Sequence, residues 1–460
     1  MPHSQLMFGY YHGDGFPAGA PDSIDRIAAL GNSNVIMINS AHPPDALRHM
    51  LDRVAACGCP FIISVSDCFF RGGRVGAIGS AHPREDSAER WAALQETLRP
   101  YERHLLGYYF DEPYWNGVSE RDFRDATRMI RRRHPDKKVM VCATALELAP
   151  DAFDCPIPEA GSGYYEFVTD GAFDIYRAWD PFLYGYLDEK LRRLLPSEAA
   201  IWYVVWGFAK GTPDGGPAAL IVNLLNHYRL ALRDRRCAGL LVFSFASGDA
   251  GDWGSGMDRL LDPPHPSYDP LLHNLQVNVG RALIGRAGDD LFVHSADGGG
   301  EGPGSRGWRY AGLDAGGSPR PLVFVPERAV WADPEGAGGL VCRDLIAPGA
   351  GGEQTLVQWA APKPGRVYVA ERGGIQLAGM SPPARLRVQI RHNDRRIWPE
   401  ADEWREIGPG AEQSGYRLKL EVVAGDCLSF VVSAGEDRTG GQDSGLLRWD
   451  PVVSYINDHS

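Results

Sequence analysis

Two adjacent acids, Asp111 and Glu112, end an apolar and aromatic run in the segment LLGYYFDEPYW, residues 105–115. Two carboxyl groups held close together among aromatic side chains resist simultaneous ionisation, so one of them keeps its proton to a higher pH than usual. A carboxyl group that is protonated near neutral pH can donate its proton to a leaving oxygen. The pair therefore predicts acid catalysis, which the hydrolysis of an acetal requires together with a second carboxylate.

The surrounding sequence predicts a barrel that would position these acids. Short apolar runs, nearly continuous and rich in β-branched and aromatic residues, are typical of parallel strands buried on both faces. They lie at 5–11, 34–39, 60–66, 105–110, 138–144, 173–179, 200–206 and 239–245. Helix-like segments separate most of them, at 22–30, 44–57, 87–104, 119–136, 181–196 and 217–236, and a further one follows at 270–285. This alternation predicts a (β/α)₈ TIM barrel over residues 1–290.

The predicted barrel gives the acids a functional position. Catalytic residues of such barrels lie where the strands end, at the carboxyl-terminal face. Asp111 and Glu112 directly follow the fourth run, so their side chains are expected in the mouth of the barrel. Capping of the next helix does not explain them, because that helix is expected to begin near Ser119. The fifth unit is the least regular, and residues 146–172 are expected to form a long loop on the active side.

The remaining sequence predicts a second domain. Residues 291–320 are rich in glycine and proline and are interpreted as a linker with loops. From residue 321 onward, short segments alternate apolar and polar residues, as in LRVQIR and YRLKLEV. Such alternation is typical of half-exposed antiparallel strands. Residues 321–460 are therefore predicted to form a β-sandwich of jelly-roll type.

The order of barrel and sandwich, with an acid after the fourth strand, resembles glycoside hydrolases of the large (β/α)₈ clan. Those enzymes end the fourth strand with Asn-Glu-Pro, and this chain has Asp111-Glu112-Pro113. The resemblance implies that Glu112 is the acid/base and that Asp111 orients it. The clan places its nucleophile at the end of the seventh strand, but AIWYVVWGFAKG contains no acid and has Trp206 and Lys210 instead.

The second catalytic carboxylate is therefore left open. Asp174 and Asp249, near the ends of the sixth and eighth runs, are the main candidates. The others are Asp180 near the sixth run, Asp252 after the eighth, Asp67 after the third and Asp14 after the first. Alternatively, the substrate's own acetamido group attacks, because an adjacent Asp-Glu pair also resembles substrate-assisted N-acetylhexosaminidases. A third possibility is a degenerate barrel that binds carbohydrate without catalysis. A metal-assisted hydrolase such as a deacetylase is a further rival.

Aromatic and polar residues at the strand ends fit a cleft that holds sugars, because aromatic faces stack on sugar rings while His and Asn supply hydrogen bonds. The predicted substrate-binding residues are Tyr10, His12, Asp14, Asn39, His42, Asp67, Tyr109, Trp115, Tyr203, Trp206 and Trp253. His12 and His42 could instead bind a metal, but no His-x-His or His-x₃-His spacing supports this, so neither a metal nor another cofactor is predicted.

The last hundred residues resemble a sandwich module found on bacterial polysaccharide-active enzymes. The matching features are Gly425-Asp426, Ser433, an acidic loop at 437–443 and Trp449-Asp450-Pro451. The resemblance implies either a carbohydrate-binding or a structural role. The acidic loop could hold calcium through oxygen ligands, although its spacing is not that of an EF-hand.

The composition of the chain limits the kinds of molecule that it is expected to bind. The formal net charge of -12 argues against nucleic acid and anionic membranes as partners. No apolar stretch approaches the ~20 residues of a membrane span. The N-terminus shows no signal peptide, so the chain is expected to be cytoplasmic or a trimmed secreted form. The eight cysteines are interpreted as free thiols. The sequence thus predicts a glycoside hydrolase acting on a polysaccharide or oligosaccharide, with its oligomeric state open.

Overall fold

The computed structural model describes residues 6–15, 22–209, 216–247, 254–286, 289–297, 305–314, 316–334, 339–349, 353–378, 385–409, 415–434 and 445–457. The chain divides into two compact units, Met1–Arg286 and Ala287–Ser460. Among the helices in these ranges, none is both long enough and apolar enough to cross a membrane.

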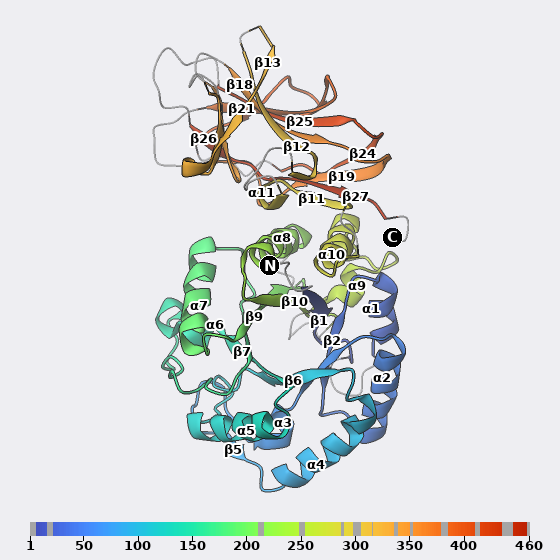
Figure 1. The fold of residues 1–460 in the computed structure, drawn as a ribbon, viewed down its shortest axis with the longest axis vertical. Helices are drawn as coiled ribbons and strands as arrows, with labels where there is room; N and C mark the ends of the chain where they lie inside the picture. Colours follow the sequence, from blue (N-terminus) through green and yellow to red (C-terminus); the bar gives the residue numbers. More distant parts are fainter. Residues whose placement is uncertain are drawn as a thin grey trace. The chain divides into compact units, whose positions relative to one another are not determined.

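The first unit is a closed barrel of eight parallel strands, as predicted (Figure 1). The strands are β1 (Met7–Tyr10), β2 (Val35–Asn39), β3 (Phe61–Ser64), β6 (Leu105–Asp111), β7 (Lys138–Thr144), β8 (Asp170–Asp174), β9 (Ala200–Trp206) and β10 (Cys237–Phe243). Each strand pairs in parallel with its neighbours around the ring, and β10 closes it against β1.

Side chains fill the interior of the barrel. In a strand, successive side chains point to opposite faces, so every second residue faces inward. On β9, for example, Trp202 and Val204 face the interior. The interior cluster consists of Tyr11, Val35, Met37, Ile62, Tyr109, Met140, Cys142, Ala172, Trp202, Val204 and Leu241. The barrel is therefore a packed core whose chemistry is limited to its ends.

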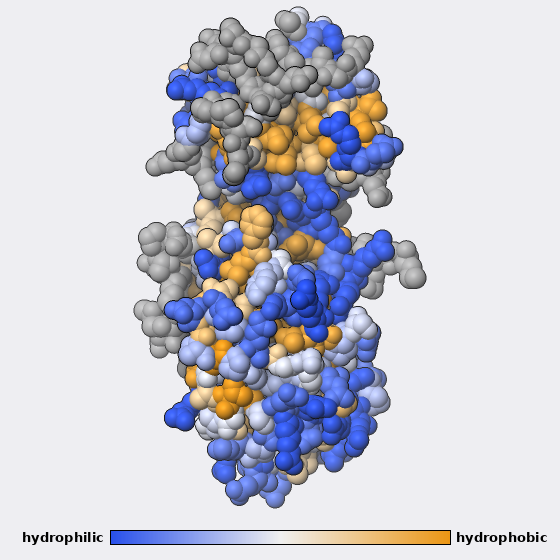
Figure 2. Space-filling view, turned by 90° about the vertical axis from the view of Figure 1, so that its left-hand side faces the viewer, coloured by the Kyte–Doolittle hydropathy of each residue, from blue (hydrophilic) through white to orange (hydrophobic). Residues whose placement is uncertain are grey.

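Helices surround the barrel at the predicted places. They are α1 (Ile24–Leu30), α2 (Pro44–Ala56), α4 (Ser87–Leu98), α5 (Glu120–Arg133), α7 (Pro181–Leu194), α8 (Pro217–Arg233) and α10 (Pro270–Leu283). Side-chain oxygens cap several of them, since Ser119 accepts from the amide of Asp122 and Asp180 accepts from those of Phe182 and Leu183. Figure 2 shows a mostly hydrophilic surface at the lower end of the barrel, where Figure 1 places α4 and α5.

Short elements fill the remaining connections of the barrel. They are α3 (Ser66–Phe69), the two-stranded pair β4 (Phe70–Arg71) and β5 (His82–Pro83), α6 (Ala145–Leu148) and α9 (Met257–Leu260). After β7 the chain forms only α6 and the 3₁₀ turn Pro150–Phe153 before β8. The segment 146–172 is thus mainly a long connection on the carboxyl-terminal side of the strands, as expected.

The sixth strand lies earlier in the sequence than the apolar run 173–179 predicted. The structure places β8 at Asp170–Asp174, and the chain leaves the strand after Asp174. Trp179 stacks on Tyr184 of α7 with ring centroids 4.0 Å apart. The later part of the run is apolar because it packs beneath a helix, and this contact produces the same sequence pattern as a buried strand.

The second unit consists of antiparallel sheets, in agreement with the predicted sandwich. Its strands are β11 (Leu291–Val293), β12 (Trp308–Leu313), β13 (Pro319–Pro321), β14 (Val323–Val325), β15 (Val330–Ala332), β16 (Leu340–Cys342), β17 (Leu345–Ala347), β18 (Gln354–Ala360), β19 (Gly365–Glu371), β20 (Gln376–Ala378), β21 (Leu386–His392), β22 (Arg395–Trp398), β23 (Arg405–Ile407), β24 (Leu418–Val422), β25 (Cys427–Ala434), β26 (Leu446–Arg448) and β27 (Pro451–Tyr455). The short helix α11 (His294–Asp297) follows β11.

The sheets share one apolar core, to which Trp308, Trp359 and Trp449 contribute fully buried rings. One sheet has the order β11-β27-β19-β24, and a second contains β13-β12-β18-β25-β21-β22 with β23 paired to β21. A third has the order β14-β15-β16-β17-β26-β20.

The prediction that residues 291–320 form a linker is corrected by the structure. β11 pairs with β27, and β12 pairs with β18, so this segment supplies strands to the second unit. Its glycine-rich and proline-rich stretches connect these strands, and the composition alone does not reveal the short strands between them. The acidic loop at 437–443, considered for calcium, lies outside the described residues.

Candidate active site

The acid pair lies at the carboxyl end of β6. Asp111 is the last residue of that strand, and Glu112 follows it with a φ of 41°, in the left-handed region. The amide of Glu112 donates to the carbonyl of Cys142 on β7, 2.9 Å away. Its own carbonyl accepts from the amide of Asn116, 2.8 Å away, which closes a tight turn. This backbone turn determines where the Glu112 carboxyl group points.

Glu112 is directed toward Asp174, the last residue of β8, and the two side chains are hydrogen-bonded. Burial, reinforced by the charges of Asp174, Asp111 and Glu147, raises the pKa of Glu112 to about 10. Burial and the charge of Asp111 raise the pKa of Asp174 to about 7, although hydrogen bonds with Tyr176 and Glu112 oppose the rise. At neutral pH this arrangement keeps a proton on Glu112, where a general acid needs it.

Asp111 is the more exposed member of the pair, and Glu112 is half-buried. The hydroxyl of Tyr109 donates to its carboxylate, and that hydroxyl lies 3.0 Å from the hydroxyl of Tyr11. The protein packed around Asp111 removes part of its hydration and raises its pKa, while the hydrogen bond from Tyr109 and the nearby His12 oppose this rise. Asp111 is therefore a carboxylate held in place by phenol groups at an accessible position.

A further buried acid, Glu147 on α6, belongs to the same group of carboxyls, and sequence reasoning missed it. Its side chain is fully buried, and burial raises its pKa to about 8 despite hydrogen bonds from Tyr165 and the amide of Trp115. Its charge is also one of the causes of the raised pKa of Glu112. An available signal was the acid in the apolar stretch ATALELA directly after the fifth strand.

Aromatic side chains pack beside the carboxyls at this end of the barrel. Tyr176 stacks on Phe243, at the end of β10, with ring centroids 5.1 Å apart, and it also contacts Phe208. Trp206, at the end of β9, meets Phe208 edge to face at 5.8 Å. Because Tyr176 and Phe243 pack against the interior cluster, they place flat apolar surfaces close to Asp174.

A second polar group joins the ends of β1 and β2. The carboxylate of Asp14 accepts from His42 Nε2 at 2.8 Å and from the amide of Asn39 at 2.7 Å. Asp14 and His42 are both buried. His12 is near this group and near Asp111, and burial lowers the pKa of His12. These four residues thus fix the geometry of the rim, and His12 connects them electrostatically to the acid pair.

Two predicted substrate-binding residues do not face the mouth, and their assignments are corrected. The hydroxyl of Tyr10 accepts from Asn32, and its fully buried ring meets Phe245 edge to face. The hydroxyl of Tyr203 donates to Asp234, which lies between α8 and β10 at the amino-terminal end of the barrel. Both are outward-facing strand residues. Tyr11, next to Tyr10, faces inward and belongs to the interior cluster.

The remaining candidates are less closely tied to the acids. Trp115 is half-buried in the loop after Glu112, and Asp67 is exposed on α3. Asp249, Asp252 and Trp253 lie outside the described residues, as does Lys210. The described end of the seventh barrel strand, Trp206 to Ala209, contains no acid. Within the described ranges, no group of three or more His, Cys, Asp or Glu side chains is arranged to hold a metal ion.

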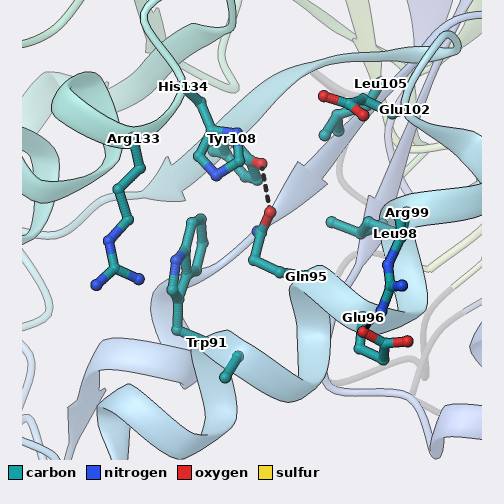
Figure 3. A pocket seen from close by; sticks show the side chains of 11 residues that line it. Trp91, Gln95, Glu96, Leu98, Arg99, Glu102, Leu105, Tyr108, Arg133 and His134 are labelled. Atoms are coloured by element: carbon teal, nitrogen blue, oxygen red, sulfur yellow. Dashed lines mark hydrogen bonds and ion pairs between the residues drawn. The ribbon is translucent and has the colours of Figure 1, made fainter.

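A separate cavity of about 430 Å³ lies on the outside of the barrel (Figure 3). Trp91 and Gln95 of α4, Tyr108 of β6 and His134 after α5 line it, and the Tyr108 hydroxyl donates to Gln95. Tyr108 points away from the interior, because its neighbour Tyr109 points inward. This cavity is therefore separate from the site that contains Asp111, Glu112, Glu147 and Asp174.

No protein-family model and no curated protein matches this sequence. Among the solved structures that resemble the chain are a glucosidase, a β-glucuronidase and a glucanosyltransferase. A glucosidase from Croceicoccus marinus is 11% identical over 95% of this chain and 97% of its own, with a TM-score of 0.38. A β-glucuronidase from Bacteroides uniformis is 12% identical over 99% of this chain but 66% of its own, with a TM-score of 0.40.

A third structure, a glycoside hydrolase family 17 β-1,3-glucanosyltransferase from Rhizomucor miehei, is 13% identical. It covers 55% of this chain and 93% of its own, with a TM-score of 0.40. Likenesses this distant do not decide an activity, so the functional conclusion depends on the residues of the site itself.

Proposed function

We propose that this protein is a glycoside hydrolase in which Glu112 is the proton donor. The observation that carries the proposal is the hydrogen-bonded pair of Glu112 and Asp174 at the barrel mouth, with the pKa of Glu112 raised to about 10. A carboxyl group of this kind is protonated at neutral pH and can protonate a glycosidic oxygen.

The other carboxyls take complementary roles in this mechanism. Glu112 passes its proton to the leaving oxygen while the bond from that oxygen to the anomeric carbon breaks. The positive charge that develops on the sugar ring is stabilised by Asp111, which solvent reaches and which Tyr109 holds by a hydrogen bond. Asp174 hydrogen-bonds to Glu112 and helps to retain its proton. A water molecule then attacks the anomeric carbon, and its proton returns the carboxyl pair to the starting state.

The charge of the site favours a neutral sugar. The charges of Asp174, Asp111 and Glu147 raise the pKa of Glu112, and the charge of Asp111 raises that of Asp174, so extra negative charge there is electrostatically unfavourable. A uronic acid would add a carboxylate to this region. We therefore expect neutral oligosaccharides and polysaccharides to be hydrolysed in preference to uronic-acid glycosides, with the aromatic rings of Tyr176 and Phe243 near the bound sugar.

A reducing-sugar screen across neutral and acidic polysaccharides tests the proposal. Wild-type protein is expected to release reducing ends from at least one neutral glycan, and Glu112→Gln to release none above background. Glu89→Gln, a change at an exposed acid on α4, is the matched control and should behave as wild type. Equal activity in wild type and Glu112→Gln would contradict the proposal.

One observation favours a second candidate function, carbohydrate binding without catalysis. The described end of β9 has no acid at the place where the resembling clan has its nucleophile. This candidate predicts no released reducing ends from any glycan, together with glycan affinity that Glu112→Gln leaves unchanged. The carbohydrate-binding role of the second unit stays a prediction, which glycan binding by the Ala287–Ser460 unit would test.

A substrate-assisted reaction is a variant of the main proposal, since Asp111 and Glu112 are adjacent. In that variant the substrate's N-acetyl group attacks the anomeric carbon and Asp111 orients it. The variant predicts that activity is restricted to N-acetylated sugars. An Asp111→Ala variant distinguishes the two, because azide can replace a missing enzyme carboxylate and restore turnover, whereas it cannot replace an orienting residue of the substrate's own group.

A further inference from the structure

Glu147 is a buried acid whose two oxygens both accept hydrogen bonds. Oε2 accepts from the backbone amide of Trp115 at 2.8 Å, and Oε1 accepts from the hydroxyl of Tyr165 at 2.8 Å. The side chain has no exposed surface. A buried carboxyl group is costly unless it is hydrogen-bonded, so its presence here calls for a specific role.

The bond to Trp115 connects Glu147 to the loop that carries the proposed proton donor. Trp115 lies in the turn that the amide of Asn116 closes onto the carbonyl of Glu112. On its other side, the carbonyl of Trp115 accepts from the amide of Gly76 at 2.8 Å. Gly76 belongs to the connection after β3, whereas Glu147 follows β7. The turn after β6 is therefore held from both neighbouring connections.

This support matters because the turn is strained. Glu112 has a φ of 41°, and a residue other than glycine in the left-handed region costs about 1–3 kcal/mol. Such a conformation persists only where the surroundings hold it. If the turn relaxed, the carboxyl of Glu112 would move relative to Asp174. A displacement of about 1 Å at a catalytic group can reduce the rate about 100-fold.

We propose that Glu147 is a positioning residue that holds the Glu112–Asn116 turn through the amide of Trp115 and so keeps Glu112 against Asp174. The effect on hydrolysis depends on the proposed function, but the positioning of Glu112 does not. Glu147 also acts on Glu112 through its charge. The titratable groups that face Glu112 are Asp111, Asp174 and Glu147. Those that face Glu147 are Tyr165 and Asp174.

The test uses two substitutions that separate shape from charge. Glu147→Gln keeps an oxygen that can accept from Trp115 but removes the charge, whereas Glu147→Leu removes both. Tyr165→Phe removes only the second partner of Glu147. Glu166→Gln is the matched control, because Glu166 is a neighbouring acid on the surface that pairs with Arg124. Near-ultraviolet circular dichroism selects the variants that are folded.

The first readout is a ¹³C NMR titration of the Glu112 carboxyl group, assigned by its loss in Glu112→Gln. Removing the charge of Glu147 lowers the pKa of Glu112, because that charge raises it. Both Glu147→Gln and Glu147→Leu should therefore shift the titration of Glu112 to lower pH, and the control should not. The positioning role is overturned if Glu112 titrates at the same pH in folded Glu147→Leu as in Glu147→Gln, because only Glu147→Leu loses the bond to Trp115.

The second readout is steady-state kinetics. Glu147→Leu is expected to lower kcat about 100-fold with little change in KM. Glu147→Gln and Tyr165→Phe are expected to lower kcat by less than Glu147→Leu, with the basic limb of the pH profile moved to lower pH in Glu147→Gln. Should Glu147→Leu fail to fold, Glu147→Gln and Tyr165→Phe carry the test. If the wild type hydrolyses no glycan while Glu112 titrates at lower pH in Glu147→Leu than in Glu147→Gln, the proposed function fails and the positioning role stands.

Discussion

Asp450 of the sandwich and Glu112 of the barrel are acids held in opposite ways. In the sandwich, Asp450 is buried and accepts from the amide and hydroxyl of Ser295 and from the guanidinium group of Arg372. Burial alone would raise its pKa, but the charge of Arg372 and these hydrogen bonds outweigh burial, and the pKa lies below its usual value. In the barrel, the carboxyl of Glu112 is hydrogen-bonded to another carboxyl, and its pKa is raised.

The comparison separates a structural acid from a candidate catalytic one. An acid paired with a cation is ionised at physiological pH and exchanges no proton there, and removal of its partner is strongly destabilising. An acid buried among other acids stays protonated, and the fold must hold this unfavourable arrangement. Trp449-Asp450-Pro451 and Asp111-Glu112-Pro113 look alike as sequence motifs, yet their surroundings give the acids different chemistry.

The largest effect is expected from Glu112→Gln, which removes the proton donor and keeps the shape of the side chain. Loss of a general acid lowers kcat about 10²–10⁴-fold. The unfolding midpoint in urea should not fall, since a neutral amide replaces a carboxyl whose ionised form is disfavoured. Kinetics and urea titration together check this, and a marked loss of stability would show that Glu112 is a structural acid like Asp450.

Arg372→Met should have the next largest effect, on stability instead of catalysis. Removing one partner of a buried ion pair leaves the charge of Asp450 without its cation and costs about 3–5 kcal/mol. The free energy of unfolding of the sandwich, measured in urea, is expected to fall accordingly. The double variant Arg372→Met/Asp450→Asn is the control and should recover part of the loss. A change below the error of the titration would mean that the pair does not stabilise the sandwich.

Ser295→Ala should cost less, because it removes one of two hydrogen bonds from Ser295 to Asp450 and leaves the backbone amide in place. Hydrogen bonds to charged groups contribute about 1.5–3 kcal/mol. Urea unfolding of the variant measures the loss. A loss as large as that of Arg372→Met would imply that hydrogen bonding, and not charge, determines the stability of this buried acid.

The contributions of Glu112 and Asp450 to stability should depend on pH in opposite ways. The pKa of Glu112 rises on folding from 4.5 to about 10, so the folded barrel binds this proton more tightly than the unfolded chain. Its contribution to stability is complete below pH 4.5 and is lost as the pH rises toward 10. Asp450 has a lowered pKa, so its contribution is present above its unfolded pKa of 3.8 and is lost as the pH falls.

Thermal unfolding followed across pH tests this contrast. The barrel transition is expected to move to lower temperature between about pH 5 and pH 8, by about 2–4 °C for each kcal/mol lost, and to move less in Glu112→Gln. The contribution of Asp450 should lower the sandwich transition in acid, and Asp450→Asn should reduce that fall. Variants whose transitions depend on pH as the wild type does would remove the distinction between Glu112 and Asp450.

The sequence predicted the barrel well because parallel strands buried on both faces leave long apolar runs that few other structures produce. Because these runs are apolar throughout, the sequence did not show which side chains point into the barrel and which point outward. A strand that is apolar on both faces has no alternation, so Tyr10 and Tyr203 could not be distinguished from inward-facing residues. Counting back in steps of two from Asp111 would have assigned Tyr109 inward and Tyr108 outward.

Other features of the site depend on contacts that are distant in sequence. Asp174 contacts Glu112 because it is the last residue of β8. The sequence predicted that this strand begins three residues later than it does. Glu147 acts through the amide of Trp115, 32 residues away. No local pattern predicts such a bond, although an acid within an apolar stretch is a signal that a buried polar contact exists.

The protonation state of Glu112 at neutral pH tests the central claim most directly. Infrared difference spectra of wild type and Glu112→Gln at pH 7 compare the carboxyl bands of the intact protein. The account predicts that the wild type has the C=O stretch of a protonated carboxyl group, which shifts in D₂O and is absent in Glu112→Gln. A difference spectrum that contains only carboxylate bands at pH 7 would contradict it.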